Sequence, residues 1–126
     1  MSPPVEFLAF NPVIPTKDMG QALEFYNDQL GFRKVFDDAG PAGGEITYAG
    51  VRREGLCFHL QAMVEGQGGA MPLIRVRVEG IEQLHQEYVE SGAVADQGPL
   101  EPTAWGTREF GIWDPNGAGL VFYEDP

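Results

Sequence analysis

One stretch of the sequence decides the fold: WGTREFGIWDPNG, residues 105–117. Its last four residues, DPNG, are strong turn formers, because proline fixes φ and glycine accepts a positive φ. The runs on either side of this turn, residues 107–112 and 120–123, are therefore predicted to be two paired strands. Trp105 then lies at the approach to a sheet, where an aromatic ring can either pack against the protein or stack on a flat ligand.

Two segments have the apolar spacing of amphipathic helices. In the first, Asp18 is the expected N-cap and Gly31 ends the helix. The second opens at about Gly80 and stops at Gly92, roughly half a chain length after the first stop. The apolar stripes consist of Met19, Ala22, Leu23, Tyr26 and Leu30, and of Ile81, Leu84, His85, Tyr88 and Val89.

The same order of elements surrounds both helices: an apolar run precedes each, and short runs rich in β-forming residues follow. The sequence therefore predicts an α+β fold in which βαβββ occurs twice, within a single domain over residues 1–126. Module 1 covers about residues 5–64 and module 2 about 71–126, and the flexible segment 65–70 joins them. The predicted strands cover residues 7–14, 32–36, 46–51, 56–62, 73–78, 94–100, 107–112 and 120–123.

One module alone cannot enclose a core, so the helices are expected on the outside of a curved mixed sheet whose other face lines a hollow. Neighbouring residues on a strand point to opposite faces. If Phe58 packs against the first helix, His59 faces the hollow; if Val76 packs against the second, Arg75 faces it. The residues placed in the hollow by this rule are Cys57, His59, Gln61, Leu73, Arg75 and Arg77.

The composition is that of an ordinary globular domain, with 43% hydrophobic and 21% charged residues. A net charge of −11 repels phosphate backbones, which argues against a nucleic-acid partner and favours cationic solutes. No apolar run is long enough to span a membrane, and the first residues lack the pattern of a signal peptide. A cytoplasmic protein without a membrane partner is therefore expected.

Several phrases of the sequence resemble the vicinal oxygen chelate superfamily, which includes glyoxalase I, extradiol dioxygenases and bleomycin resistance proteins. The resemblance covers essentially the whole chain and includes the repeated βαβββ order. The phrases that carry it are NPVIPTKDM (11–19), FYNDQLGF (25–32) and DPNG (114–117).

Within that superfamily the sequence is most similar to the bleomycin-binding resistance proteins, through YAGVR (48–52), VEGI (78–81) and WGTREF (105–110). This resemblance implies non-catalytic sequestration of a small planar or cationic molecule, such as a bleomycin-type antibiotic, without a cofactor. It also implies a homodimer that exchanges its first strand, for which Pro12 and Pro15 are suited, with ligand clefts at the subunit interface. The expected ligand-binding residues are Tyr48, His59, Arg75, Trp105, Phe110 and Trp113.

The alternative function is that of a metal-dependent lyase, isomerase or dioxygenase of the same superfamily. Its enzymes bind a divalent metal on the first, fourth, fifth and eighth strands, and catalytic metals need about three protein ligands. The matching positions here are Asn11, His59, Leu73 and Val121. Only His59 is a good ligand among them, so no metal site is expected unless the ligand register is shifted.

Two of the expected site residues have more than one interpretation. His59 can be a polar group of the ligand hollow, or a buried histidine paired with a backbone carbonyl. Arg75 can bind the carboxylate of a metabolite, which would make the protein an atypical member of its superfamily. Alternatively, Arg75 or Arg77 pairs with an acidic residue such as Glu109 or Glu45.

Overall fold

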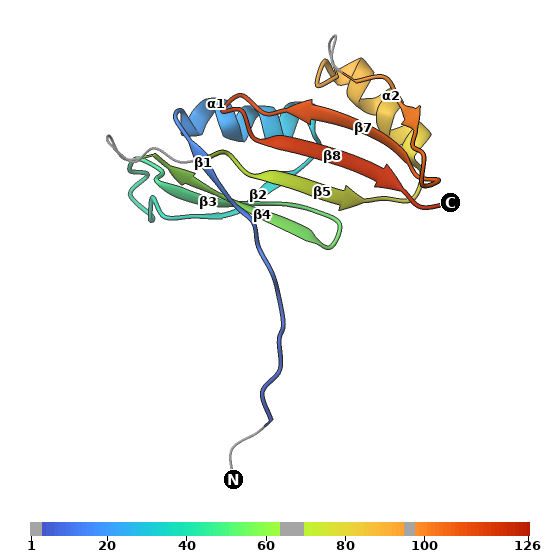
Figure 1. Ribbon diagram of the computed structural model, residues 1–126. Coiled ribbons are helices and arrows are strands. Elements are labelled where there is room, and N and C mark those ends of the chain that lie inside the picture. The colour runs from blue at the N-terminus through green and yellow to red at the C-terminus, as the bar shows by residue number, and fades with distance from the viewer. Residues whose placement is uncertain (1–3, 64–69, 95–97) are drawn as a thin grey trace.

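The computed structural model describes residues 4–63, 70–94 and 98–126. The predicted α+β class is confirmed, and Figure 1 shows the arrangement of the elements. Module 1 contains β1 (Val13–Thr16), α1 (Met19–Glu24), a π-helical turn η1 (Phe25–Gln29), β2 (Arg33–Asp37), β3 (Tyr48–Arg53) and β4 (Leu56–Ala62). Module 2 contains β5 (Leu73–Arg77), α2 (Ile81–Ser91), β6 (Glu101–Pro102), β7 (Arg108–Trp113) and β8 (Gly119–Glu124).

Each module forms its own mixed sheet, so the described residues contain two four-stranded sheets rather than one continuous curved sheet. The strand orders are β1-β4-β3-β2 and β5-β8-β7-β6. In both sheets the first strand pairs in parallel with the last strand of its module, and the remaining pairs are antiparallel. The two modules are therefore topological copies of each other.

Both helices begin and end close to the predicted residues. Asp18 caps α1, because its Oδ1 accepts a hydrogen bond of 2.9 Å from the backbone N–H of Gln21. The helix then widens into η1, which the apolar spacing did not predict, and the chain turns at Gly31 with φ of 77°. Helix α2 ends at Gly92 in the left-handed conformation.

One hydrophobic core serves both modules. Helix α1 packs on β4 of the first sheet, and α2 packs on β7 and β8 of the second. The Tyr26 hydroxyl donates a 3.0 Å hydrogen bond to Asp114, and the Tyr88 hydroxyl donates one of 2.8 Å to the Leu30 carbonyl. Burial raises the pKa of both tyrosines, that of Tyr88 to about 12. Buried polar contacts thus connect the two halves through their helices.

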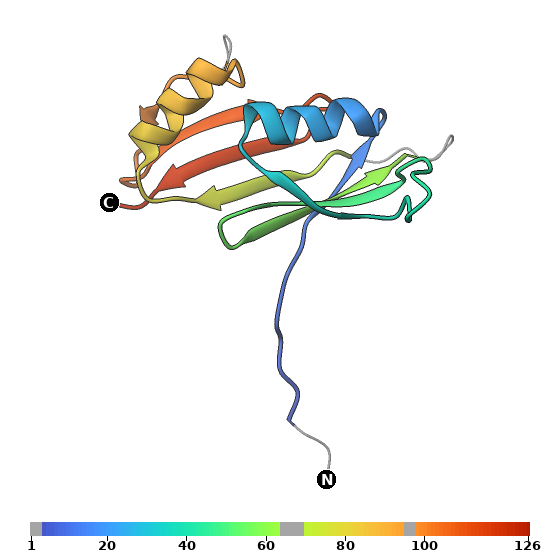
Figure 2. The same ribbon diagram turned by 180° about the vertical axis from the view of Figure 1, so that it is seen from behind.

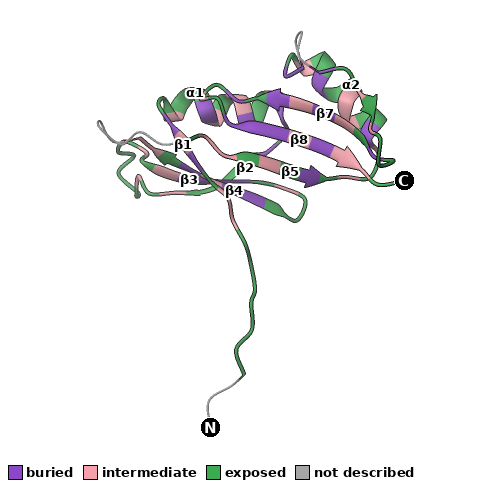
Figure 3. Ribbon diagram, viewed as in Figure 1, coloured by how far each residue is buried: buried purple, intermediate pink, exposed green. Residues whose placement is uncertain are grey.

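Residues 4–12 form an arm rather than a strand, although the sequence predicted a strand over residues 7–14. The arm runs away from the folded body in both views of the ribbon (Figures 1 and 2). It is exposed along residues 4–10 (Figure 3), with Phe7 96% and Phe10 89% exposed. Large apolar side chains are rarely left in water in a row, so the exposure of this arm is an unusual feature of the single chain.

Two connecting segments, residues 65–70 and 94–100, are only partly described by the structure. Of the predicted strand 94–100, residues 94 and 98–100 are not in a strand and residues 95–97 lie outside the described part; the short β6 follows at Glu101–Pro102. The predicted joining segment 65–70 also lies outside it, except for Ala70. The described part contains no helix that could cross a membrane.

Candidate functional site

The face of the first sheet that is turned away from the helices carries three ring side chains. Phe58 and Leu60 are buried against the helix side, so His59 points to the opposite face, as alternation predicted. Tyr48 and Gly50 lie on the same open face, because the register pairs Tyr48 with Gln61 and Gly50 with His59.

The three rings on this open face are those of Phe36, Tyr48 and His59, and we call them the aromatic cluster. Phe36 stacks on Tyr48 with ring centroids 6.3 Å apart and meets His59 edge to face at 5.1 Å. Tyr48 Oη lies 2.8 Å from His59 Nδ1. His59 is therefore a polar group on the open face, partnered by a phenol rather than by a backbone carbonyl.

Gly50 makes room for this cluster. A Cβ atom at Gly50 would lie 2.1 Å from Cε1 of Phe36, so the Phe36 ring occupies the space that any larger residue would need. Phe36 is not among the ligand-binding residues expected from the sequence. Its position depends on an irregularity in the β2–β3 pairing between Lys34 and Phe36, which carries Phe36 onto the open face.

The open face of the second sheet carries a guanidinium in contact with aromatic and acidic groups. Arg75 Nη2 lies 2.8 Å from Glu109 Oε2, and the guanidinium carbon lies 4.5 Å from the centre of the Tyr123 ring. Hydrogen bonding from Arg75 holds the pKa of Glu109 below its ordinary value, and Thr107 and Trp105 add to this effect. Arg75 faces the open side as predicted, but the carboxylate of Glu109 already neutralises its charge.

Both tryptophans are strongly exposed, Trp105 to 68% and Trp113 to 60%. Trp113 lies over Gly119 of the neighbouring strand, where a Cβ atom would come within 2.9 Å of Cζ3. The second sheet thus repeats the device of the first, in which an aromatic ring covers a glycine across the strand pair.

Phe110 does not belong to this surface, although it was expected to contact ligand. It is 3% exposed and lies on the helix side of β7, where it stacks on Phe122 at 5.3 Å and meets His85 at 4.9 Å. The reason is alternation: Phe110 is one residue from Glu109, which is on the open face, so the two side chains point in opposite directions.

The positions that hold metal in the superfamily's enzymes do not fit a divalent ion here. Leu73 and Val121 have no donor atoms, and the Asn11 amide donates a 3.0 Å hydrogen bond to the Cys57 carbonyl. In the part of the chain that the structure describes, no three His, Cys, Asp or Glu side chains converge on a common point. His59 remains the single good ligand of the set.

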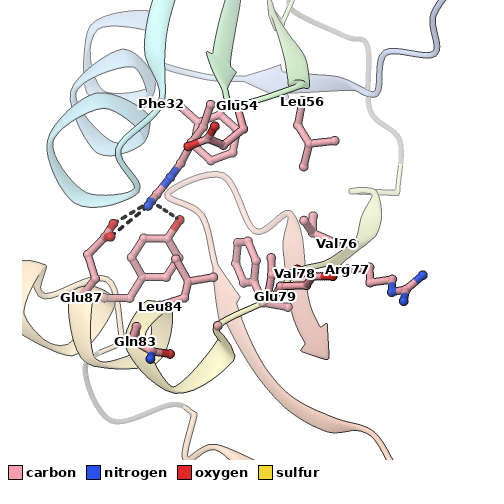
Figure 4. A pocket seen from close by; sticks show the side chains of 14 residues that line it. Phe32, Glu54, Leu56, Val76, Arg77, Val78, Glu79, Gln83, Leu84 and Glu87 are labelled. Atoms are coloured by element: carbon pink, nitrogen blue, oxygen red, sulfur yellow. Dashed lines mark hydrogen bonds and ion pairs between the residues drawn. The ribbon is translucent and has the colours of Figure 1, made fainter. Parts of the chain in front are cut away.

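A separate cavity of about 640 Å³ lies between the β3–β4 hairpin, β5 and α2 (Figure 4). Phe32, Val76 and Leu84 supply apolar lining, and Arg77 points away from the cavity. On one side the Arg53 guanidinium contacts both carboxylate oxygens of Glu87, at 2.6 and 2.9 Å. The cavity therefore offers apolar contact area, and the charges of Arg53 and Glu87 at its edge neutralise each other.

The chain is similar to known proteins along almost its full length. It is 25% identical to the bleomycin resistance protein of Geobacillus stearothermophilus, covering 90% of this chain and 93% of that one. The fold matches the bleomycin-binding protein of bleomycin-producing Streptomyces verticillus, solved with copper(II)-bleomycin, at a TM-score of 0.68, 26% identity, and coverage of 94% and 96%. It also matches a glyoxalase-related enzyme from Clostridium phytofermentans at a TM-score of 0.75, 25% identity, and coverage of 97% and 98%.

The family comparison agrees with the duplicated topology. The model of the family described as glyoxalase superfamily protein matches residues 3–126, which is nearly the entire chain. The repeated βαβββ order and the parallel pairing of first and last strands are present in both modules. This protein is therefore a member of the glyoxalase superfamily.

Proposed function

We propose that this protein binds and sequesters a small planar molecule without converting it, and that bleomycin-type antibiotics are the first candidates. The observation that carries the proposal is the pair of open sheet faces on which aromatic rings lie over glycines. Side chains placed in this way present flat apolar area to an incoming ring system. Stacking on such rings contributes about 1 kcal/mol per contact beyond the area that is buried.

The choice of bleomycin-type compounds is supported by the relatives. A bleomycin resistance protein and a protein solved with copper(II)-bleomycin both align with this chain over at least 90% of its length. The net charge of −11 would also speed the association of a cationic ligand at low ionic strength.

We infer further that the working form is a homodimer in which the arm of each subunit packs on the other. The arm carries four large apolar side chains that are all more than 80% exposed in the single chain, and they need cover. These residues are Val5, Phe7, Leu8 and Phe10. A second subunit would also turn the open sheet faces into the walls of enclosed clefts. Enclosed clefts of this kind typically bury most of the surface of a small ligand.

The direct test is a titration with copper(II)-bleomycin, followed by tryptophan fluorescence. We expect saturable quenching, because both tryptophans are exposed, Trp113 on β7 and Trp105 in the turn that precedes it. Trp105→Leu should weaken binding, whereas Val89→Ser, which alters an exposed apolar residue on α2, should not. Unchanged fluorescence up to high micromolar ligand would remove this antibiotic class.

Metal content separates sequestration from the metal-dependent alternative. The protein would be dialysed against zinc, nickel, manganese and iron in turn, and its bound metal measured by elemental analysis. We expect substoichiometric metal, since His59 lacks partner ligands in the described residues. Tight, stoichiometric metal would contradict the proposal.

A further inference from the structure

Two arginines face each other on the open face of the first sheet, beside the aromatic cluster. Arg33 on β2 and Arg52 on β3 are direct cross-strand partners, so their side chains lie on the same face. Phe36 and Gly50 form the neighbouring pair on that face, two residues along β3. Two residues of a strand span about 7 Å, so this distance along β3 separates the Arg33–Arg52 pair from the Phe36–Gly50 pair.

Neither arginine has a counterion among the residues that the structure describes, which is unusual in a protein so rich in acids. The chain has eight Lys and Arg residues against nineteen Asp and Glu, and all eight are in the described ranges. Five of the eight form ion pairs: Lys34, Arg53, Arg75, Arg77 and Arg108. Arg33 and Arg52 form none with a described acidic residue. Like charges directly opposite each other on a sheet are destabilising.

The acidic residues that line a hollow together with the arginine pair form no ion pair with it. Glu54 and Glu87 line the same hollow of about 600 Å³ as Arg33 and Arg52. Arg53 donates to both carboxylate oxygens of Glu87. Glu54 lies in the β3–β4 turn and forms no ion pair with a described residue. Within the described residues, both guanidiniums therefore remain available to an external anion.

We propose that the open face of the first sheet binds an aromatic anion, with the ring on the aromatic cluster and the anionic group between Arg33 and Arg52. Guanidinium groups bind carboxylates through two parallel hydrogen bonds, which fixes orientation as well as charge. This inference rests on the proposed role in binding planar molecules and adds a ligand class to it. It differs from an anion site at Arg75, whose charge is satisfied by Glu109.

Naphthalene-2-carboxylate and the neutral naphthalene-2-carboxamide are suitable probes, because they share a ring and differ in charge. Binding of each would be measured by calorimetry to the wild-type protein, to Arg33→Gln/Arg52→Gln, and to Lys17→Gln. Lys17 is the remaining cation without an ion pair among the described residues; it lies just before α1 and belongs neither to the arginine pair nor to the aromatic cluster. The double variant should fold, because the substitution removes a like-charge pair; its unfolding temperature would be checked.

We expect the wild type to bind the carboxylate at least tenfold more tightly than the carboxamide, a difference of about 1.4 kcal/mol. The preference should fall to about one in the double variant and persist in Lys17→Gln. Phe36→Ser should weaken both probes equally. Amide chemical-shift changes should map to β2 and β3.

Three outcomes would overturn the inference: no preference in the wild type, a preference that survives in the double variant, or no binding of either probe at millimolar concentration. A copper(II)-bleomycin titration of the same samples keeps the two proposals apart. Failure of bleomycin with a retained carboxylate preference would reject the antibiotic alone. Bleomycin binding without that preference would reject the anion site alone.

Discussion

At the scale of single residues, Gly50 decides whether Phe36 can lie on the open face. We expect Gly50→Ala to displace the Phe36 ring, because the new Cβ atom would lie 2.1 Å from it. Phe36 is 41% exposed and can swing towards solvent, so the unfolding free energy should change by less than about 1 kcal/mol. Loss of nuclear Overhauser contacts between Phe36 and Tyr48 would report the displacement.

Gly111 provides the matched control for this substitution. It also lies on a strand, and a Cβ atom there would make only ordinary contacts, at 3.7 Å or more. Gly111→Ala should therefore leave the aromatic cluster and its ligand affinity unchanged. Equal effects of the two substitutions would show that Gly50 has no special role.

Glu109 should remain ionised at a pH where an ordinary glutamate is protonated. Arg75 lowers its folded-state pKa, so the stabilisation from this pair is present above the unfolded pKa of about 4.3 and is lost as pH falls through the folded value. Carbon-13 NMR of the carboxyl group should give a pKa below 4.3, which rises in Arg75→Gln. Arg77→Gln, which removes the pair with Asp125 instead, should leave it unchanged.

At the scale of the elements, β7 has two faces with different roles. Phe110 lies in the core and Trp113 on the open face. Phe110→Ala should therefore destabilise the protein by about 3–5 kcal/mol, the usual cost of truncating a buried phenylalanine. Trp113→Ala should cost much less stability and reduce ligand binding. Urea denaturation of both variants distinguishes the two faces, and similar stability losses would contradict this division.

Most elements could be predicted from the sequence because each local signal agreed with the final structure. Asp18 and Gly92 mark helix ends by their backbone preferences, and alternation placed His59 and Arg75 on the open face. Phe36 could not be placed, since the irregular β2–β3 pairing is a property of two strands together. Phe110 was expected to bind ligand because it belongs to the WGTREF motif, whereas its place on β7, next to Glu109, directs its side chain into the core.

At the scale of the whole molecule, the exposed apolar arm predicts that two chains associate. We expect a dimer in sedimentation velocity experiments at micromolar concentration, and Phe7→Ser/Phe10→Ser should raise the dissociation constant at least tenfold. Both side chains are almost fully exposed in the single chain, so their loss should leave the fold of each subunit intact. A dimer unaffected by the double substitution would show that the arm is not the contact.

What covers the two open sheet faces could not be predicted from the sequence, for a physical reason. Alternation assigns a face to each side chain, but it does not say how two sheets are oriented or what covers them. Likewise, the lack of an ion pair at Arg33 and Arg52 among the described residues depends on where the fold places the carboxylates of other strands and helices. Long-range charge pairing depends on the assembled fold, not on neighbours in the chain.

The strand order determines when each sheet can form while the chain is being synthesised. In each sheet the last strand of the module lies directly beside the first, as β4 beside β1 and β8 beside β5. Neither sheet can close until its whole module has left the ribosome, and such distant pairing is slow compared with the formation of a hairpin. The β3–β4 hairpin is therefore a natural nucleus for the first half, and a stop codon that removes β8 would leave the second half without its central strand.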